Sequence, residues 1–176
     1  MKSKESKSRS VTLFSKIMKI KLVLTDCDGV LTDAAVYYSN RGEEMKKFSI
    51  RDGMGVERLR NLVNIETGIV TGELSPSVKK RAEKLKIKEL HLGTKNKVLV
   101  LNEILKRKNL KSENVAFIGD DVNDLEIIKL AGLTACPSDA IDEVKKIADY
   151  VCTNRGGHGA FREFAELIIK KNLKRK

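Results

Sequence analysis

Short apolar runs alternate with longer amphipathic stretches along most of this chain. The apolar runs are rich in Val, Ile and Leu and predict buried β-strands at residues 20–25, 65–71, 89–92, 115–119, 133–136 and 150–152. Apolar residues that recur at helical spacing predict α-helices over residues 53–63, 76–85, 98–108, 121–130, 138–148 and 159–171. This alternation is typical of an α/β domain in which a doubly wound parallel sheet carries helices on both faces.

One segment interrupts the alternation directly after the first predicted strand. Residues 34–48 contain two short β-prone stretches on either side of a turn with Gly42, and this pattern predicts a β-hairpin. A hairpin at this point overhangs the carboxyl edge of the sheet, where folds of this class bind ligands. We therefore expect a small hairpin flap beside any functional site.

The formal charge of +11 is concentrated at the two ends of the 176-residue chain. Residues 1–19 carry a net charge of +5 and residues 170–176 another +5, which leaves +1 for residues 20–169. We expect a flexible basic N-terminal extension (1–19), one folded domain (20–169) and a basic C-terminal tail (170–176). A nearly neutral domain with 5% aromatic residues and no Trp does not fit a nucleic-acid-binding surface.

The three cysteines, Cys27, Cys136 and Cys152, are widely spaced, and each lies in or beside an apolar strand. This number and spacing fit reduced core residues better than a disulfide set or a metal site. The first residues lack the apolar core of a signal peptide, and no apolar stretch is long enough to cross a membrane. We expect a cytoplasmic protein without a membrane partner.

The most informative motif is Asp26-Cys27-Asp28-Gly29-Val30, at the end of the first apolar run. Alternation along an extended chain points Asp26 and Asp28 to the same side. Two carboxylates this close repel each other unless a cation lies between them, and a hard divalent ion suits oxygen ligands best. A polar Asp-Gly turn without chemistry gives the same sequence, so the pair alone leaves both interpretations open.

Polar motifs of this kind follow other predicted strands as well. Each is weak alone, because Thr-Gly pairs are common in turns, a lone lysine is commonly a solvated charge, and Asp121 and Asp124 could serve only to start a helix. In a parallel sheet, however, strand ends of one polarity meet along one edge. The features expected at this edge are Asp26-x-Asp28, Thr71-Gly72-Glu73, Lys97 and Gly119-Asp120-Asp121-x-Asn123-Asp124.

Together these groups have the chemistry of phosphoryl transfer. Asp26, Asp28 and Asp120 could supply three of the roughly six oxygen ligands of Mg²⁺. One carboxylate can attack phosphorus to give an aspartyl-phosphate, and a second can move protons to the leaving group and from water. Hydroxyl, backbone N–H and lysine groups can hold phosphate oxygens, and the phosphate-binding candidates are Thr71, Gly72, Lys97 and Asn123.

These motifs, in this order, resemble the haloacid dehalogenase-like (HAD) phosphatases. More narrowly, Phe48-Ser-Ile-Arg51-Asp52-Gly53-Met-Gly and Gly156-Gly157-His158-Gly159-Ala160-Phe161-Arg162-Glu163 resemble the capless 3-deoxy-ulosonate phosphatases. That group includes Kdo-8-phosphate phosphatases, nine-carbon (KDN- or sialic-acid-type) 9-phosphate phosphatases, and a domain fused to some CMP-sialate synthetases. The resemblance covers residues 20–169.

The resemblance implies roles for individual residues. Asp26 would be the nucleophile, Asp28 the acid/base that also offers Mg²⁺ its backbone carbonyl, and Asp120 the remaining protein ligand. Proteins of this group are homotetramers in which the hairpin and the C-terminal tail of a neighbouring subunit help to close the site. The substrate-binding candidates are Arg51, Asp52, Gly53, Glu73, Arg81 and Lys84.

Some departures from the family pattern bear on the substrate. Kdo-8-phosphate phosphatases tend to carry arginine where this chain has Glu57 and Glu73, and the combination of Glu73 with Arg81 and Lys84 resembles the nine-carbon enzymes. A glutamate would repel a bare ulosonate but could accept hydrogen bonds from its hydroxyl groups. Both glutamates could equally be solvated charges without substrate contact. Asn96 stands where family members often carry Asp, which removes one partner for the lysine that follows.

We therefore expect a Mg²⁺-dependent phosphoric monoester hydrolase that acts on a 3-deoxy-2-ulosonic acid phosphate. A nine-carbon 9-phosphate is slightly favoured over Kdo-8-phosphate. The alternative is a non-catalytic assembly domain that partners a CMP-sugar-acid synthetase. That alternative requires loss of the nucleophile or of the metal-binding acids, whereas Asp26, Asp28 and Asp120 are all present.

Overall fold

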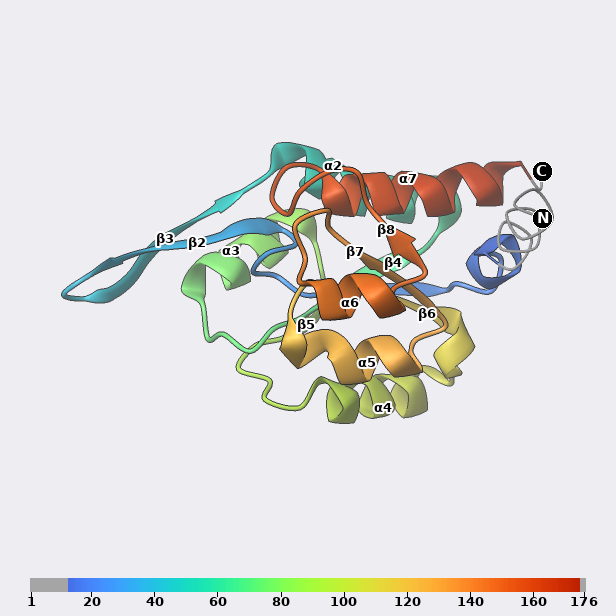
Figure 1. Ribbon diagram of the computed structural model, residues 1–176, viewed down its shortest axis with the longest axis horizontal. Helices are drawn as coiled ribbons and strands as arrows, with labels where there is room; N and C mark the ends of the chain where they lie inside the picture. Colours follow the sequence, from blue (N-terminus) through green and yellow to red (C-terminus); the bar gives the residue numbers. More distant parts are fainter. Residues whose placement is uncertain (1–12, 175–176) are drawn as a thin grey trace.

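The computed structural model describes residues 13–174. Its centre is a six-stranded sheet of order β5-β4-β1-β6-β7-β8, in which neighbouring strands are parallel (Figure 1). The predicted α/β fold with a doubly wound parallel sheet is confirmed. The strands are β1 (Leu22–Thr25), β4 (Glu66–Val70), β5 (Glu89–His91), β6 (Val115–Ile118), β7 (Leu133–Cys136) and β8 (Tyr150–Val151).

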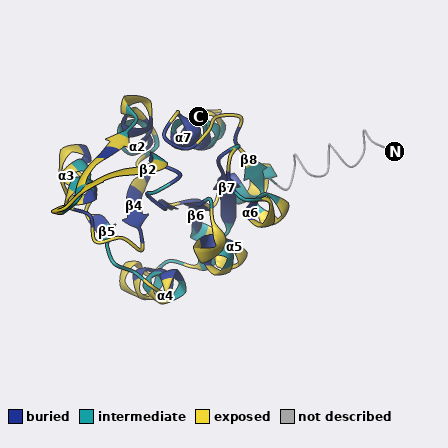
Figure 2. Ribbon diagram, turned by 60° about the vertical axis from the view of Figure 1, so that its left-hand side comes forward, coloured by how far each residue is buried: buried dark blue, intermediate teal, exposed yellow. Residues whose placement is uncertain are grey.

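Helices cover both faces of the sheet, and the central strands between them are buried (Figure 2). Val23 belongs to the core on one face, whereas Leu22 and Leu24 belong to the core on the other, as strand alternation requires. The first core also contains residues of α2 (Ile50–Val63), α3 (Pro76–Leu85) and α7 (Ala160–Leu173). The second contains residues of α4 (Lys97–Lys108), α5 (Leu125–Leu130) and α6 (Asp142–Ile147).

Helices α2 and α6 begin at residues other than those expected. α2 begins at Ile50 instead of residue 53, because the Ser49 side chain accepts a hydrogen bond from the Asp52 N–H and caps the helix. Residues 138–141 lie outside α6. Here the Ser138 N–H donates to the carbonyl of Asn154, and the Asp139 carboxylate accepts from the Gly156 N–H, so this segment follows the loop after β8.

The folded domain extends past the expected bounds at both ends. Ile17 is fully buried in the core, and Lys16 pairs with Asp149, so residues 13–19 lie against the domain. At the other end, α7 continues to Leu173. Residues 1–12 of the expected N-terminal extension, and residues 175–176 of the expected tail, lie outside the described residues.

The expected hairpin consists of β2 (Thr32–Ser39) and β3 (Gly42–Phe48), which pair antiparallel and project from the body of the molecule (Figure 1). Most of its side chains are exposed, including those of Tyr37, Tyr38 and Met45 (Figure 2). The side chain of Lys46 is different, because only 3% of it is exposed. The hairpin therefore carries a buried charge where it joins the body.

The cysteines have the expected surroundings, since Cys27, Cys136 and Cys152 are all buried and free. Burial raises the pKa of the Cys136 thiol to about 11, so this thiol stays protonated near neutral pH. Over residues 13–174, no helix combines the length and apolar character that crossing a membrane requires.

Candidate active site

Adjacent strands bring the predicted motifs to one edge of the sheet. β1 lies between β4 and β6, so Asp26, Thr71 and Asp120, which follow these strands, are neighbours at its carboxyl edge. The Asp26 N–H donates to the Ile118 carbonyl at 2.9 Å, which extends the β1–β6 pairing up to the site. Lys97, the first residue of α4, reaches the same place from the loop after β5.

Three carboxylates form a compact cluster at this edge. Asp26, Asp120 and Asp124 each offer an oxygen, and these oxygens lie within 4.8 Å of one another. Asp26 is 4% exposed and Asp124 is fully buried. Within the described part of the chain, Asp120 Oδ1 is buried without a hydrogen-bond partner, which is the state expected of an oxygen that binds a cation.

Repulsion between the carboxylates of the cluster also indicates a cation-binding site. Burial, followed by repulsion from Asp124, raises the pKa of Asp26 to about 7 from its ordinary 3.8, although Lys97 opposes this shift. Burial, followed by repulsion from Asp26 and Asp124, raises the pKa of Asp120 to about 8. A divalent cation with a preference for oxygen ligands would remove this repulsion, so the residues fit Mg²⁺.

Asp124 belongs to this cluster as well, although its place in the sequence also fits the start of a helix. The predicted single helix over 121–130 is instead a 3-10 turn, Val122–Asp124, followed by α5. This turn brings Asp124 Oδ2 to 2.9 Å from the Asp120 N–H and 3.4 Å from the Asp121 N–H, which both donate to it. The buried carboxylate thereby holds the loop that carries Asp120.

Lys97 neutralises part of the cluster. Its side chain is 3% exposed, and its Nζ lies 3.0 Å from Asp26 Oδ2 and 2.6 Å from Asp124 Oδ1. Burial alone would lower the pKa of Lys97, but the two carboxylates raise it, so the side chain remains a cation. Asn96 is the N-cap of α4, since its Oδ1 accepts hydrogen bonds from the N–H groups of Val98 and Leu99.

Asp28 lies apart from the carboxylate cluster, contrary to the alternation expected for it. The strand ends at Thr25, and the chain turns through Gly29, whose φ of +82° favours glycine. The Asp28 side chain, 30% exposed, is instead held by the hairpin: Lys46 Nζ donates to its Oδ2 at 2.6 Å, and Thr32 Oγ1 donates to its Oδ1 at 3.2 Å. Its side chain is therefore available for a role other than metal binding.

The Thr71-Gly72 turn joins β4 to α3. Thr71 is 2% exposed, and its backbone N–H donates to the His91 carbonyl, so the turn is anchored to the strand beside it. Gly72 is exposed, and a Cβ added there would have Thr94 O as its nearest neighbour, at 3.9 Å. Asn123 is exposed. Phosphate binding by these residues stays a prediction.

The expected substrate-binding residues divide into buried and exposed groups. Asp52 is 1% exposed, and its two oxygens accept hydrogen bonds from the backbone N–H groups of Gly159 and Arg162. A Cβ on Gly53 would lie 2.5 Å from Arg81 Nη2, which donates to the Ser49 carbonyl. These three residues therefore have roles within the fold, whereas the exposed candidates, whose substrate contacts remain untested, are Arg51, Glu73 and Lys84.

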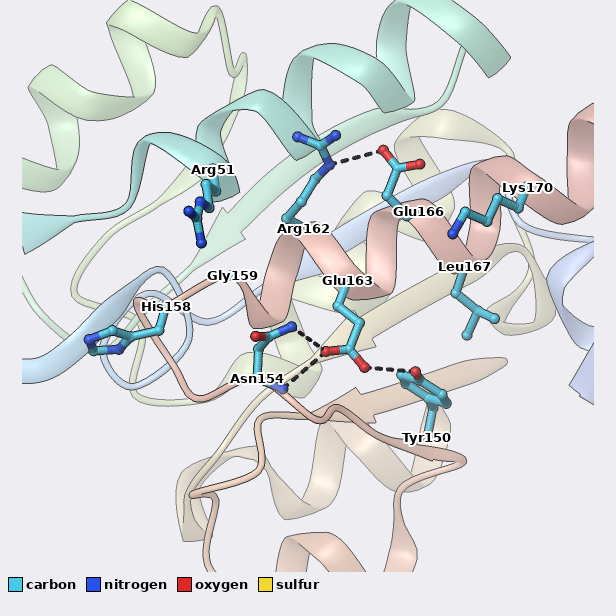
Figure 3. A pocket seen from close by; sticks show the side chains of 10 residues that line it. All are labelled: Arg51, Tyr150, Asn154, His158, Gly159, Arg162, Glu163, Glu166, Leu167 and Lys170. Atoms are coloured by element: carbon cyan, nitrogen blue, oxygen red, sulfur yellow. Dashed lines mark hydrogen bonds and ion pairs between the residues drawn. The ribbon is translucent and has the colours of Figure 1, made fainter.

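A cavity of about 380 Å³ lies on the surface of α7 and shares no lining residue with the carboxylate cluster. Figure 3 shows Arg51 reaching from α2 toward its His158 end. Glu163, which lines the cavity, accepts hydrogen bonds from Tyr150 and from Asn154. Within this cavity, Glu163 therefore serves to hold the loop after β8.

Comparison with known proteins agrees with this geometry. Residues 84–163 match a family model described as haloacid dehalogenase-like hydrolase. The chain is 38% identical, over 91% of its length and 85% of the relative, to a 3-deoxy-D-manno-octulosonate 8-phosphate phosphatase of Salmonella typhi. It is 37% identical, over 88% of its length and 86% of the relative, to the phosphatase of that name from Haemophilus influenzae.

Solved structures agree as well. The cobalt-bound form of a deoxy-D-mannose-octulosonate 8-phosphate phosphatase from Haemophilus influenzae superposes with a TM-score of 0.87 at 36% identity, over 90% of this chain and 92% of that one. The Moraxella catarrhalis 3-deoxy-D-manno-octulosonate 8-phosphate phosphatase was solved in complex with a magnesium ion, a phosphate ion and a KDO molecule. It superposes with a TM-score of 0.87 at 34% identity, over 90% of this chain and 91% of that one.

The fold and site define a hydrolase of phosphoric monoesters, and the chain belongs to the haloacid dehalogenase-like hydrolases. Within them, it falls in the group of sugar-acid phosphatases to which these relatives belong, as its motifs predicted.

The roles of two residues of the site could not be read from the sequence. Asp124 had a signal, since it ends the run Gly119-Asp120-Asp121-x-Asn123-Asp124, but that run also fits a helix start. Lys46 had none, because it stands beside Lys47 in a hairpin strand and only the folded chain distinguishes them.

Proposed function

We propose that this chain is a Mg²⁺-dependent phosphatase that hydrolyses Kdo-8-phosphate through an aspartyl-phosphate on Asp26. The observation that carries the proposal is the buried cluster of Asp26, Asp120 and Asp124 beside Lys97, at the same sheet edge as the Thr71-Gly72 turn. Relatives with this name, and a solved relative that holds magnesium, phosphate and KDO, support it.

In this mechanism each side chain has a distinct task. An oxygen of Asp26 attacks phosphorus, and the Asp28 carboxyl group protonates the leaving oxygen and then accepts a proton from water. Lys97 and the Thr71-Gly72 turn hold the phosphate oxygens. Asp26, Asp120 and the Asp28 carbonyl would hold Mg²⁺, which supplies positive charge to the anionic transition state.

The substrate assignment rests on the relatives, because the names of those compared give Kdo-8-phosphate. The nine-carbon preference argued from Glu57 and Glu73 has no support from them. It remains a second candidate on one observation. Glu73 is exposed and lies two residues after Thr71, at the turn that we propose binds phosphate.

The experiment that tests the substrate compares kcat/KM for Kdo-8-phosphate and for a nine-carbon ulosonate 9-phosphate on one preparation with Mg²⁺. We expect Kdo-8-phosphate to be hydrolysed at least about tenfold more efficiently. A preference of similar size for the nine-carbon substrate would overturn the assignment and support a substrate contact at Glu73. The variant Glu73→Arg should then shift the ratio back toward Kdo-8-phosphate.

We also propose that the protein lies in the cytoplasm, where its three free thiols remain reduced.

We propose further that it forms a homotetramer in which the hairpin and the C-terminal tail of one subunit contribute to the site of a neighbour. The exposed Tyr37, Tyr38 and Met45 of the hairpin support the assembly, because exposed apolar patches mark interfaces. Light scattering after size exclusion tests it. A monomer at assay concentration would contradict the proposal.

A further inference from the structure

Lys46 connects the hairpin to the group that we propose transfers protons. It lies on β3, its side chain is 3% exposed, and its Nζ is 2.6 Å from Asp28 Oδ2. A second carboxylate, Glu43, has its Oε2 3.7 Å from the same nitrogen. Removing an ammonium group from water is costly unless charged partners compensate. The buried Lys46 side chain therefore depends on its contacts with Asp28 and Glu43.

The network extends to the helix that follows the phosphate-binding turn. The Ser75 Oγ donates to Glu43 Oε1 at 2.5 Å and also accepts from the Val78 N–H as the N-cap of α3. Lys46 and Glu43 of the hairpin therefore contact both Asp28 and the start of α3. A displacement at the root of the hairpin would move the partner of Asp28.

Asp28 needs such a partner, because it follows the end of β1 and is 30% exposed. A partly exposed carboxylate can rotate about its side-chain bonds, and rotation moves its oxygens away from the leaving group. Here each oxygen has its own donor: Thr32 Oγ1 holds Oδ1, and Lys46 Nζ holds Oδ2. General acid catalysis depends on such geometry.

We propose that Lys46 is a positioning residue that holds the Asp28 carboxyl group in line with the leaving oxygen of the substrate. This inference rests on the proposed function, in which Asp28 is the acid/base. Lys46 itself does not touch the reacting atoms. It fixes where Asp28 delivers its proton, and through β3 it makes that position depend on the hairpin.

The test compares two substrates that differ in their need for a proton. A sugar phosphate releases an alkoxide and needs the acid, whereas p-nitrophenyl phosphate releases a stable phenolate and does not. The rate of leaving-group release is measured in single turnovers with saturating Mg²⁺, because the later step, in which Asp28 accepts a proton from water, is common to both substrates. In Lys46→Met this rate should fall roughly 30- to 300-fold for Kdo-8-phosphate and change less than about threefold for p-nitrophenyl phosphate. Equal losses on both substrates would overturn the inference and indicate a structural role.

The neighbouring lysine provides a matched control. Lys47 also pairs with an aspartate, Asp33 of β2, but its side chain is 57% exposed. Lys47→Met removes the same charge from the same strand, and we expect both rates to stay within about twofold of wild type. If Lys46→Met does not fold, Lys46→Ala removes the donor by truncation. Lys46→Arg, which keeps a donor to Asp28, should restore most of the loss on the sugar phosphate.

Further variants separate this inference from the proposed function. In single turnovers, Asp28→Asn should show the same selective loss of leaving-group release as Lys46→Met, and a uniform loss there would contradict the role of Asp28 itself. Asp26→Asn should abolish hydrolysis of both substrates. If these two variants behave as expected and Lys46→Met has wild-type rates on both substrates, only the role of Lys46 fails.

Discussion

The single residue Asp124 connects the loop that carries Asp120 to the side chain of Lys97. One of its oxygens accepts hydrogen bonds from the loop that carries Asp120, and the other pairs with Lys97. Because it is fully buried, its charge acts on Asp26 and Asp120 with little screening by water. Its contribution is to hold the loop and to keep the site attractive to a cation.

The variant Asp124→Asn tests this role. Removing the charge should weaken Mg²⁺ binding roughly 10- to 100-fold, as is typical when a partner of a metal ligand is lost. Isothermal titration with Mg²⁺ measures the dissociation constant. Asp121→Asn is the control, because Asp121 is exposed and caps the same 3-10 turn. Equal dissociation constants for wild type and Asp124→Asn would contradict the assigned role.

Residues at strand ends could be placed from the sequence, and residues in loops could not. Asp26, Thr71 and Asp120 follow apolar strands that any parallel sheet aligns, so their common edge was predictable. The side chain of Asp28 was misplaced, because alternation ends with the strand and the turn at Gly29 takes over. Contacts made across the fold, such as Lys46 with Asp28, leave no local pattern.

The start of α7 is stabilised by a side chain from another helix, α2. Gly159, its N-cap residue, has no side chain for capping, so the Asp52 carboxylate of α2 accepts the N–H groups of Gly159 and Arg162. The Arg-Asp-Gly segment resembled a substrate-binding motif, yet its aspartate satisfies helix donors that would otherwise be buried without partners. Helix caps from distant elements cannot be read from local sequence.

The variant Asp52→Ala distinguishes these roles. Loss of two hydrogen bonds to buried N–H groups should lower the free energy of unfolding by roughly 2–4 kcal/mol, with KM nearly unchanged. Urea denaturation and steady-state kinetics measure the two effects. Asn61→Ala, on the exposed side of α2, is the control for stability. A raised KM without loss of stability would instead indicate a substrate contact.

The Glu163 carboxylate holds the loop after β8 against the first turn of α7. Burial would raise the pKa of Glu163, but hydrogen bonds from Thr153, Tyr150 and Asn154 lower it to about 2 from 4.5. Between about pH 2 and pH 4.5, the folded state therefore binds fewer protons than the unfolded state. The stabilisation by Glu163 is complete above about pH 4.5 and is lost as the pH falls toward 2.

We expect Glu163→Gln to cost roughly 1–2 kcal/mol of stability at neutral pH, because Glu163 is partly exposed. The cost should shrink as the pH falls below about 4.5, as denaturation curves over a pH series would show. Glu143→Gln, in the exposed first turn of α6, should change little. A pH-independent difference between Glu163→Gln and wild type would contradict the explanation.

Metal binding is linked to the stability of the whole folded molecule through the protonation of the carboxylate cluster. Without metal, Asp26 and Asp120 have pKa values of about 7 and 8, above the ordinary 3.8. The folded state then binds more protons than the unfolded state, so these groups reduce stability as the pH rises from about 4 to 8. Mg²⁺ competes with those protons.

The increase in Tm caused by Mg²⁺ should therefore be several degrees larger at about pH 8.5 than at about pH 6. Differential scanning fluorimetry with Mg²⁺ and with EDTA measures it. In Asp120→Asn, which removes one of the titrating groups, the dependence on pH should become weaker. An increase in Tm that is the same at both pH values would be inconsistent with protonation of the cluster.

The central claim is that this carboxylate cluster hydrolyses a sugar-acid phosphate. The most direct measurement is phosphate release from Kdo-8-phosphate by wild type and by Asp26→Asn, each with Mg²⁺ and with EDTA. We predict release by wild type with Mg²⁺, loss of that release in EDTA, and a rate reduced roughly a thousandfold or more in Asp26→Asn. Undiminished release by Asp26→Asn, or release that EDTA does not affect, would contradict the account.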